Sequence, residues 1–325
     1  KMKTVGIIGA SGYTGGELLR LVINHPSLIL YFVYSRTRPG TDVSETHPDL
    51  LGQVELKFTD KVKTDVDILF LCLGHGNSST FLEKHSFLDS TVIIDLSNDF
   101  RLKNDSLFQG REFIYGLPEI NKDAIKKSKS IANPGCFATA IQLALLPLAK
   151  ENKLNNTIHI NATTGSTGAG VVSSPTSHFS WRNNNLSWYK PFTHQHLGEI
   201  EETLNQLQGK DTDILFLPQR GDFTRGIFVS SYTFFDGNLN DAFELYESFY
   251  KEEPFTQVSK KELHLKLVIN SNQCFLHLHK HNDQLLITSI IDNLIKGASG
   301  QAIQNLNILM GWEEKLGLKL KTSIF

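Results

Sequence analysis

The sequence is poor in cysteine and in net charge, and both shortages narrow the choice of function. Three cysteines, Cys72, Cys136 and Cys274, occur among 325 residues, far apart and in no CxxC pair. This spacing predicts neither a disulfide framework nor a zinc site and suits a reducing compartment, so we expect a cytoplasmic protein. Basic and acidic residues number 32 and 34, a net charge of -2. So small an imbalance gives no sign of a partner such as a nucleic acid or a membrane.

Long apolar runs and internal repeats are also missing. No apolar stretch approaches the roughly 18–20 residues of a membrane helix, and the chain enters a strand almost at once, so we expect no secretory signal. Hydrophobic residues still make up 40% of the sequence. At roughly 100–200 residues per domain, the length predicts two domains.

A glycine-rich turn between a strand and a helix opens the chain. Residues 4–8 are typical of a strand, residues 9–16 of a turn and residues 17–22 of a helix. Such a turn lets the backbone approach a pyrophosphate, which rests on the helix N-terminus. The spacing is G-x-x-G-x-x-G rather than G-x-G-x-x-G, so the flanking strand and helix favour nucleotide binding over a mere tight turn. The predicted cofactor contacts here are Gly9, Ser11, Gly12, Tyr13, Thr14 and Gly15.

The end of the second predicted strand, residues 28–34, indicates which dinucleotide is bound. An NAD site usually has Asp or Glu there to hold the ribose 2′-hydroxyl, whereas Ser35 and Arg36 suit a 2′-phosphate. A solvated basic loop is the alternative. We predict NADP.

Strands and helices keep alternating in this half of the chain. Residues 66–71 and 91–95 form nearly continuous apolar strands on either side of a helix near 78–84. This alternation predicts an α/β fold with a doubly wound, parallel sheet of the Rossmann type. Ligands of such a sheet lie at the carboxyl ends of its strands, where Gly74 and Arg101 fall.

A strand that breaks at Asn133-Pro134-Gly135 leads to Cys136, which opens a buried helix predicted over residues 137–149. Unpaired N–H groups and the helix dipole favour an anion at this end. They therefore favour the thiolate, the form that attacks carbon. A small apolar residue packed at a helix start is the alternative, and this stretch alone does not decide between them.

The second half carries another glycine-rich loop, residues 163–170, and a helix predicted to end near residue 208. Backbone N–H groups around Ser166 and Gly168 are placed to face the nicotinamide or an anionic substrate, although a flexible turn has the same composition. His196 and Glu199, three residues apart, share a face near the helix start. A carboxylate that holds one imidazole nitrogen leaves the other for proton transfer, whereas an ordinary helix start with an ion pair is the alternative.

The remaining segments predict a mixed or antiparallel sheet within an α+β domain. The expected strands are residues 213–217, 226–235, 265–269, 273–279 and 284–291. His277, His279 and His281 share a strand face, but no cysteine or carboxylate completes a metal site, so we predict none. We expect an NADP-binding domain over residues 1–133, completed by a C-terminal helix at about 297–325. Residues 134–296 then form the catalytic and oligomerisation domain.

A nucleotide domain, a cysteine at a helix start and a histidine on another helix suit hydride transfer through a cysteine-bound intermediate. Together the motifs resemble the N-acetyl-gamma-glutamyl-phosphate reductase family from Val5 to Gly311. The resemblance rests on residues 9–18, 95–101, 115–119, 133–136 with Thr139, 225–227 and 292–307.

This resemblance implies an NADPH-dependent step of arginine biosynthesis that makes N-acetylglutamate 5-semialdehyde and phosphate. It implies that Cys136 attacks the acyl phosphate, that NADPH reduces the thioester and that His196 protonates the aldehyde oxygen. Such enzymes are usually homo-oligomers, so a homodimer or homotetramer is expected. The substrate contacts that we assign with it are Asn133, Arg101, Arg225 and Ser166, and the further cofactor contact is Asn293.

One departure from the family pattern leaves the substrate's acyl group open. The family typically reads His-Arg-His-x-Pro-Glu-Ile, whereas this chain has Gln195 and Gly198. Together with the unassigned stretch 177–190, this leaves N-acetyl and N-succinyl substrates as alternatives, and the part played by His194 undecided. Two rival hypotheses are an enzyme like aspartate-semialdehyde dehydrogenase and a non-catalytic NADP-binding sensor. A sensor predicts that Cys136 reacts with iodoacetamide no faster than Cys72 or Cys274.

Overall fold

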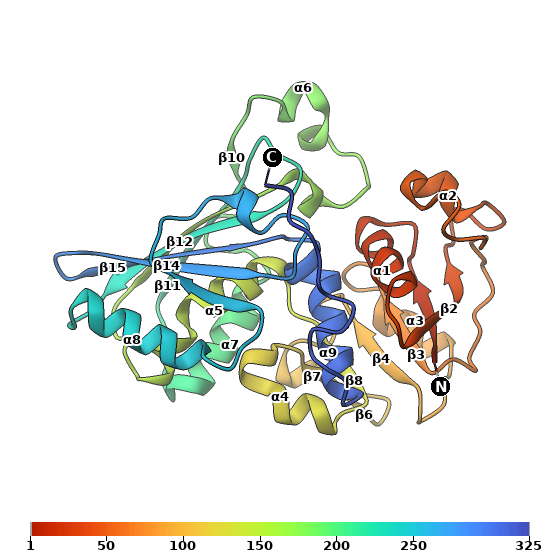
Figure 1. Ribbon diagram of the computed structural model, residues 1–325, viewed down its shortest axis with the longest axis horizontal. Coiled ribbons are helices and arrows are strands. Elements are labelled where there is room, and N and C mark those ends of the chain that lie inside the picture. The colour runs from red at the N-terminus through yellow and green to blue at the C-terminus, as the bar shows by residue number, and fades with distance from the viewer. Residues whose placement is uncertain (1, 325) are drawn as a thin grey trace. The chain divides into compact units, whose positions relative to one another are not determined.

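The chain forms two compact units in a computed structural model that describes residues 2–324. The first unit comprises the residues up to Gly135 together with Ala298–Lys319, and the second comprises Cys136–Gly297 and the residues from Leu320 onward. Figure 1 labels the elements of both.

The first unit is built on a six-stranded parallel sheet in the order β2-β1-β3-β4-β8-β7. Its strands are β1 (Lys3–Ile8), β2 (Leu28–Tyr34), β3 (Ile68–Leu71), β4 (Val92–Asp95), β7 (Ile114–Tyr115) and β8 (Ser130–Ala132). Every residue of β3 and β4 is buried, because helices and loops cover both faces of a parallel sheet. The predicted doubly wound fold is confirmed.

Short elements and helices complete this unit. The helices are α1 (Tyr13–Ile23), α2 (Val43–Thr46), α3 (Ser78–Lys84), α4 (Pro118–Lys127) and α9 (Gly300–Leu309), and β5 (Leu107–Phe108) pairs with β6 (Arg111–Glu112). Helix α9 packs on α1 and α4. It ends at Leu309, within the C-terminal segment of about 297–325 that was expected to complete this unit. Gly311 and Gly317 have φ of 69° and 72°, which a right-handed helix cannot contain.

The second unit is built on a seven-stranded mixed sheet in the order β10-β11-β9-β12-β15-β14-β13. Its strands are β9 (Ile158–Thr164), β10 (Ser187–Trp188), β11 (Ile214–Arg220), β12 (Ile227–Phe234), β13 (Thr256–Ser259), β14 (Cys274–His281) and β15 (Gln284–Ile291). The pairs β9–β11 and β13–β14 are parallel and the others antiparallel, so the predicted mixed sheet is confirmed.

One predicted strand is wrong. Residues 265–269 contain a single turn of 3-10 helix, Leu265–Leu267, closed by a bond from the Val268 N–H to the Leu265 carbonyl. Asn270 follows with φ of 66°, so the backbone turns instead of extending. The edge strand beside β14 is β13, which the sequence patterns did not reveal.

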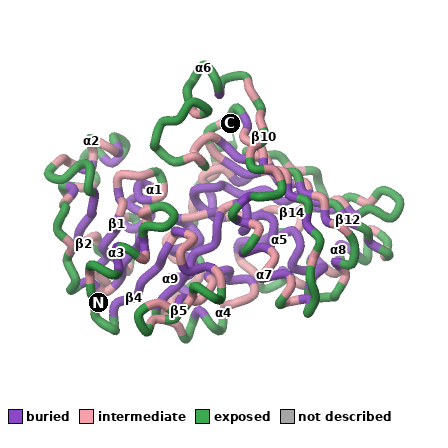
Figure 2. Tube along the Cα trace, turned by 180° about the vertical axis from the view of Figure 1, so that it is seen from behind, coloured by how far each residue is buried: buried purple, intermediate pink, exposed green. Residues whose placement is uncertain are grey.

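The helices of this unit are α5 (Cys136–Lys150), α6 (Phe179–Arg182), α7 (Leu197–Gln208) and α8 (Leu239–Tyr250). Helix α5 packs against α7 and the sheet, and Phe137 to Ala149 are all buried (Figure 2). Pro147 has no N–H for the Leu143 carbonyl one turn earlier. The Tyr250 hydroxyl donates to that carbonyl at 2.5 Å instead, so the buried helix tolerates its proline.

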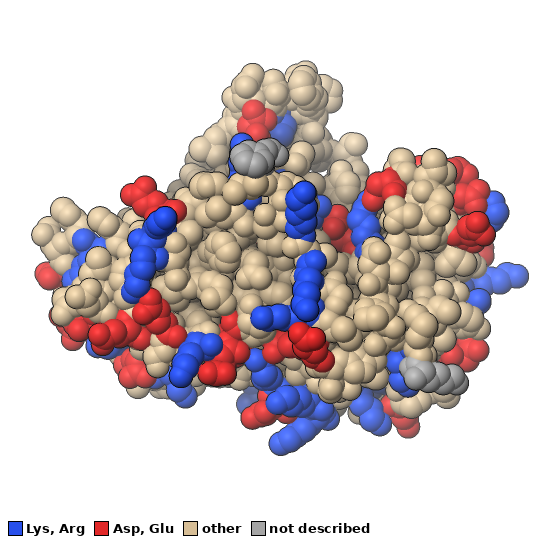
Figure 3. All heavy atoms as spheres, viewed as in Figure 1, with Lys and Arg blue, Asp and Glu red and all other residues tan. Residues whose placement is uncertain are grey.

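The surface carries both signs of charge. Basic and acidic side chains lie interspersed over the face shown in Figure 3, and neither sign dominates it. None of the helices formed by residues 2–324 is both long and apolar enough to cross a membrane. Within the same residues, no group of three or more His, Cys, Asp or Glu side chains is arranged to hold a metal ion.

Candidate active site

The reactive-cysteine candidate lies at the start of α5. Cys136 is the first helical residue and is half-buried, while the next residue, Phe137, is fully buried. Gly297 lies directly beside it, since a Cβ added at Gly297 would come within 2.8 Å of the Cys136 Cβ. Only glycine leaves this side of Cys136 open. Small residues near position 297 are visible in the sequence, but no pattern there assigns them to the site.

Two histidines lie beside this helix start. The rings of His194 and His196 lie 5.4 and 6.3 Å from the Phe137 ring and 4.6 Å from each other, measured between centroids. His194 Nδ1 accepts the backbone N–H of His196 at 3.1 Å, which fixes the approach to α7. The structure therefore brings His196 to the start of α5, and it places His194 there too, although the sequence left its part undecided.

Glu199 lies on the same face of α7 as His196. Its Oε1 is 4.0 Å from His196 Nε2, and both side chains are buried. That separation is longer than a hydrogen bond. Glu199 is therefore a close, buried neighbour of the imidazole ring.

Tyr189 and Arg220 also reach this cluster, and neither was predicted from the sequence. The Arg220 guanidinium lies 4.6 Å from the centre of the Tyr189 ring, and that ring lies 5.7 Å from His194. Burial and, to a smaller extent, negative charge on Cys136 raise the pKa of Tyr189 to about 12, while Arg220 acts to lower it. The phenol therefore stays protonated at neutral pH. Tyr189 belongs to a stretch without periodicity, and β11 runs past its predicted end, residue 217, to Arg220.

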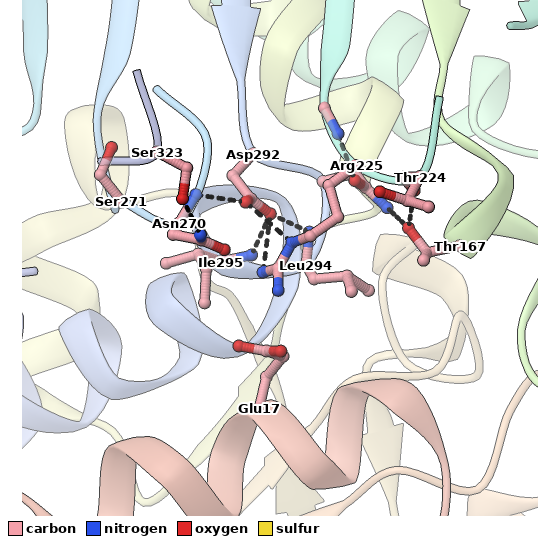
Figure 4. Close-up of polar contacts among 12 residues, drawn as sticks. Glu17, Thr167, Thr224, Arg225, Asn270, Ser271, Asp292, Leu294, Ile295 and Ser323 are labelled. Carbon is pink, nitrogen blue, oxygen red and sulfur yellow. Dashed lines mark hydrogen bonds and ion pairs between the residues drawn. The ribbon is translucent and has the colours of Figure 1, made fainter. Parts of the chain in front are cut away.

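Arg225 and Asp292 form a bidentate ion pair near the end of β15 (Figure 4). Arg225 donates from Nε at 3.1 Å and from a terminal nitrogen at 3.2 Å to the fully buried Asp292, which also accepts the N–H groups of Asn270, Leu294 and Ile295. The structure thus places Arg225, the predicted anion holder, on a protein carboxylate.

The second glycine-rich loop is closed by the protein itself. The N–H groups of Ser166, Thr167 and Gly168 donate to the carbonyls of Phe223, Thr224 and Gly165. The N–H groups that were expected to face a ligand are bonded within the protein, because the loop forms a 3-10 turn, Ser166–Ala169, bonded to residues 223–224. Asn293 supports the loop by accepting the Gly226 N–H at 2.7 Å and donating to Thr167 Oγ1 at 3.0 Å.

In the first unit, the glycine turn and the start of α1 form an open cradle. Gly9 has φ of 79°, and a Cβ there would lie 2.4 Å from the Cys72 carbonyl oxygen. At Gly15 a Cβ would come within 2.6 Å of the Ala10 Cα, whereas one at Gly12 would meet nothing closer than 3.6 Å. Helix α1 has no side-chain cap and no acid in its first turn, so its N–H groups suit an anion.

The other predicted cofactor residues lie around this cradle. Ser11 Oγ is 3.0 Å from Oγ of the buried Ser35, Arg36 is exposed at the end of β2, and Tyr13, the first residue of α1, is 43% exposed. The Thr14 carbonyl accepts the Ser299 hydroxyl, and Gly74 lies exposed in the turn after β3 with φ of 76°.

Arg101 and Asn133 stiffen the turn that ends β8. The buried Arg101 donates to the carbonyls of Asn133 at 2.9 Å and Leu96 at 3.1 Å. Asn133 donates to the Ala298 carbonyl and accepts from Asn305 Nδ2, both at 3.1 Å. Both predicted substrate residues are thus bonded within the first unit.

A buried carboxyl lies at the carboxyl end of β4. Asp95 accepts the hydroxyls of Ser78 and Ser97, each at 2.6 Å. Burial raises the pKa of Asp95 to about 6, although these hydrogen bonds act to lower it. Burial, with the Asp95 charge, also raises the pKa of Cys72, which keeps that thiol protonated and makes it a poor nucleophile.

Residues 4–128 match the family "Semialdehyde dehydrogenase, NAD binding domain", and residues 136–293 match "Semialdehyde dehydrogenase, dimerisation domain". The chain is 59% identical to N-acetyl-gamma-glutamyl-phosphate reductase of Flavobacterium johnsoniae and 53% identical to that of Christiangramia forsetii, over 100% of each chain. This chain belongs to the N-acetyl-gamma-glutamyl-phosphate reductase family. The predicted resemblance and enzyme class are confirmed, and the first unit is a nicotinamide-dinucleotide-binding domain.

Solved structures of other members of this wider class have the same fold. Aspartate semialdehyde dehydrogenase II from Vibrio cholerae matches with a TM-score of 0.72 at 15% identity, over 96% of this chain and 99% of that one. The enzyme of Candida albicans, solved with NADP, matches with a TM-score of 0.70 at 13% identity, over 95% and 99%.

Proposed function

We propose that this chain catalyses the NADPH-dependent reduction of N-acetyl-gamma-glutamyl phosphate to N-acetylglutamate 5-semialdehyde and phosphate. The observation that carries the proposal is the packing of His194 and His196 on Phe137, the residue after Cys136. It gathers a nucleophile and a proton-transfer group within one unit of a chain whose full-length relatives bear that enzyme's name.

Cys136 is the nucleophile. Its Sγ attacks the acyl carbon, the bond from that carbon to the phosphate oxygen breaks, and phosphate leaves, so a thioester remains on Cys136. The N-terminus of α5 favours the thiolate that starts this step. Gly297 supports access by leaving the Cys136 Cβ uncovered on one side.

His196 transfers the proton. The oxygen of the acyl group gains negative charge when the thioester is reduced, and the imidazolium of His196 donates a proton to it. The bond from carbon to the Cys136 sulfur then breaks, the proton returns to His196, and the aldehyde leaves with the thiolate restored. Glu199 lies 4.0 Å from Nε2 and stabilises that imidazolium. His194, which accepts the His196 N–H, holds His196 in position.

The cradle in the first unit fits NADP. The backbone at Gly9, Gly12 and Gly15 and the uncapped start of α1 would hold the pyrophosphate, and Ser35 and Arg36 would hold the 2′-phosphate. When bound, the cofactor supplies the hydride. The absence of Asp or Glu at the end of β2, residues 34–38, supports NADP over NAD.

The test is the reverse reaction: phosphate-dependent reduction of NADP+ with N-acetyl- and N-succinylglutamate 5-semialdehyde. We expect turnover with the N-acetyl substrate and a loss of more than about 10,000-fold in Cys136→Ser. Cys274→Ser, which changes a buried thiol near Ser289 Oγ, is the matched control and should keep activity. Turnover with the N-succinyl substrate alone would correct the acyl group. No turnover with either, alongside intact NADP+ binding, would favour a non-catalytic sensor.

We further propose a cytoplasmic homodimer or homotetramer. The sheet of the second unit exposes Leu215, Tyr232 and Phe234 on alternate positions of β11 and β12. Apolar and aromatic side chains of this kind are enriched in subunit interfaces. Light scattering of the purified protein tests this, and a monomer at micromolar concentration would contradict it.

A further inference from the structure

The three arginines of the second unit differ in what holds their guanidinium groups. Arg225 is held by the carboxylate of Asp292. Arg182 is buried and donates to the backbone carbonyls of Arg220 and Gly221 and to Ser187 Oγ. Arg220 shares with Arg182 a buried Nε that has no hydrogen-bond partner among residues 2–324, but its guanidinium lies against the Tyr189 ring and not against backbone carbonyls.

Arg220 is the last residue of β11 and points to the side of the sheet where Phe137 and His194 lie. Successive side chains of a strand alternate between faces, so Arg220 shares a face with Phe216. The Phe216 ring lies 5.3 Å from Phe137 and 5.6 Å from His194. The guanidinium of Arg220 is therefore directed to the region around the start of α5.

Tyr189 holds the guanidinium on its other side. Its ring lies 4.6 Å from the Arg220 guanidinium carbon, a cation–π distance, and its N–H donates to the Pro218 carbonyl. The Tyr189 ring also lies 5.7 Å from His194, which in turn lies 5.4 Å from Phe137, so the cation lies near the start of the helix that carries the thiol. A buried donor without an acceptor is costly, and an anion bound here would relieve that cost.

We propose that Arg220 binds a carboxylate of the substrate, with Tyr189 as the residue that positions its guanidinium. The planar fork of an arginine matches a carboxylate in two parallel hydrogen bonds. This inference deepens the proposed function and rests on it for the identity of the substrate. The carboxylate is either the alpha-carboxylate of the glutamyl group or the terminal carboxylate of an N-succinyl group. A guanidinium binds either of them through the same pair of hydrogen bonds.

The first test measures binding without turnover. Mass spectrometry follows the rate at which iodoacetamide alkylates Cys136 in the full-length protein. The rate is measured at increasing concentrations of N-acetylglutamate or of N-succinylglutamate. At least one ligand should protect the wild type, and Arg220→Gln should weaken that protection about 10- to 100-fold. Arg220→Lys, which keeps the charge and loses the fork, should fall between them. Lys251→Gln, an exposed charge loss at the end of α8, should change nothing.

The second test identifies the carboxylate, using the alpha-amide of N-acetylglutamate as a third ligand. If Arg220 binds the alpha-carboxylate, the amide protects Cys136 of the wild type poorly. In Arg220→Gln, the acid and the amide then protect Cys136 equally. If it binds the acyl carboxylate, the wild type prefers N-succinylglutamate and the variant loses that preference. No protection by any ligand, or equal protection in wild type and Arg220→Gln, overturns the proposal. Protection without turnover would instead overturn the proposed reaction and leave the carboxylate site standing.

Discussion

The two units of this chain build their sites from different materials. In the first unit the cradle consists of backbone: three glycines and the uncapped start of α1, all within residues 9–15. In the second unit the site consists of side chains from separate elements, among them Cys136, Tyr189, His196 and Arg220. A backbone site depends on local conformation, whereas a side-chain site depends on how helices and strands pack. Substitutions in each unit should therefore affect different measurements.

The largest effect is expected from Gly9→Ala in the backbone-built site. Its Cβ would lie 2.4 Å from the Cys72 carbonyl oxygen, and φ of 79° disfavours any L side chain. We expect the first unit to lose about 3–5 kcal/mol of stability. NADP+ binding, measured by calorimetry, should fail, while alkylation of Cys136 proceeds at the wild-type rate. Intact NADP+ affinity would show that the turn does not need glycine here.

A smaller effect is expected from Gly297→Ala in the side-chain-built site. The new Cβ would come within 2.8 Å of the Cys136 Cβ and displace the nucleophile. A shift of this kind lowers kcat about 100-fold. NADP+ affinity should stay at the wild-type value, which makes this variant the converse of Gly9→Ala. Wild-type kcat with an unchanged melting temperature would refute the assigned role of Gly297.

The smallest effect concerns pH and the buried Asp95 of the first unit. Its folded pKa of about 6 is above its ordinary value, so the folded state holds this proton more tightly than the unfolded state. Its contribution to stability is therefore present at low pH and is lost as pH rises, by about 2 kcal/mol between pH 4 and pH 6. Urea unfolding at several pH values should show this loss in the wild type but not in Asp95→Asn. Parallel pH profiles would contradict the raised pKa.

Local patterns predicted much of the fold. Strand β2 and helix α3 begin and end where the sequence patterns placed them, because an apolar run and a short helix between turn signals leave few alternatives. The prediction failed at residues 265–269, where alternating residues coil into a 3-10 turn. Alternation indicates a strand only when a neighbouring strand is available, and β13 occupies the position beside β14.

Part of the candidate site was also predictable from the sequence, and part was not. Cys136 and the His196–Glu199 pair were found because each lies at a helix start and has a short-range pattern. Tyr189 and Arg220 were missed, and two other arginines were assigned to anions instead. Nothing in the sequence reveals that Asp292 holds Arg225 or that backbone carbonyls hold Arg101, since these partners lie far along the chain.

The sequence by itself determined the glycine turn, the alternation of strands and helices, and the cysteine at the start of a buried helix. These features depend on backbone conformation and on the spacing of apolar residues within one element. The tertiary structure alone decided which arginine lies against Tyr189 beside His194, because the Tyr189–Arg220 contact joins an irregular segment to the end of β11. Such contacts are set by packing between distant segments, and no local pattern records them.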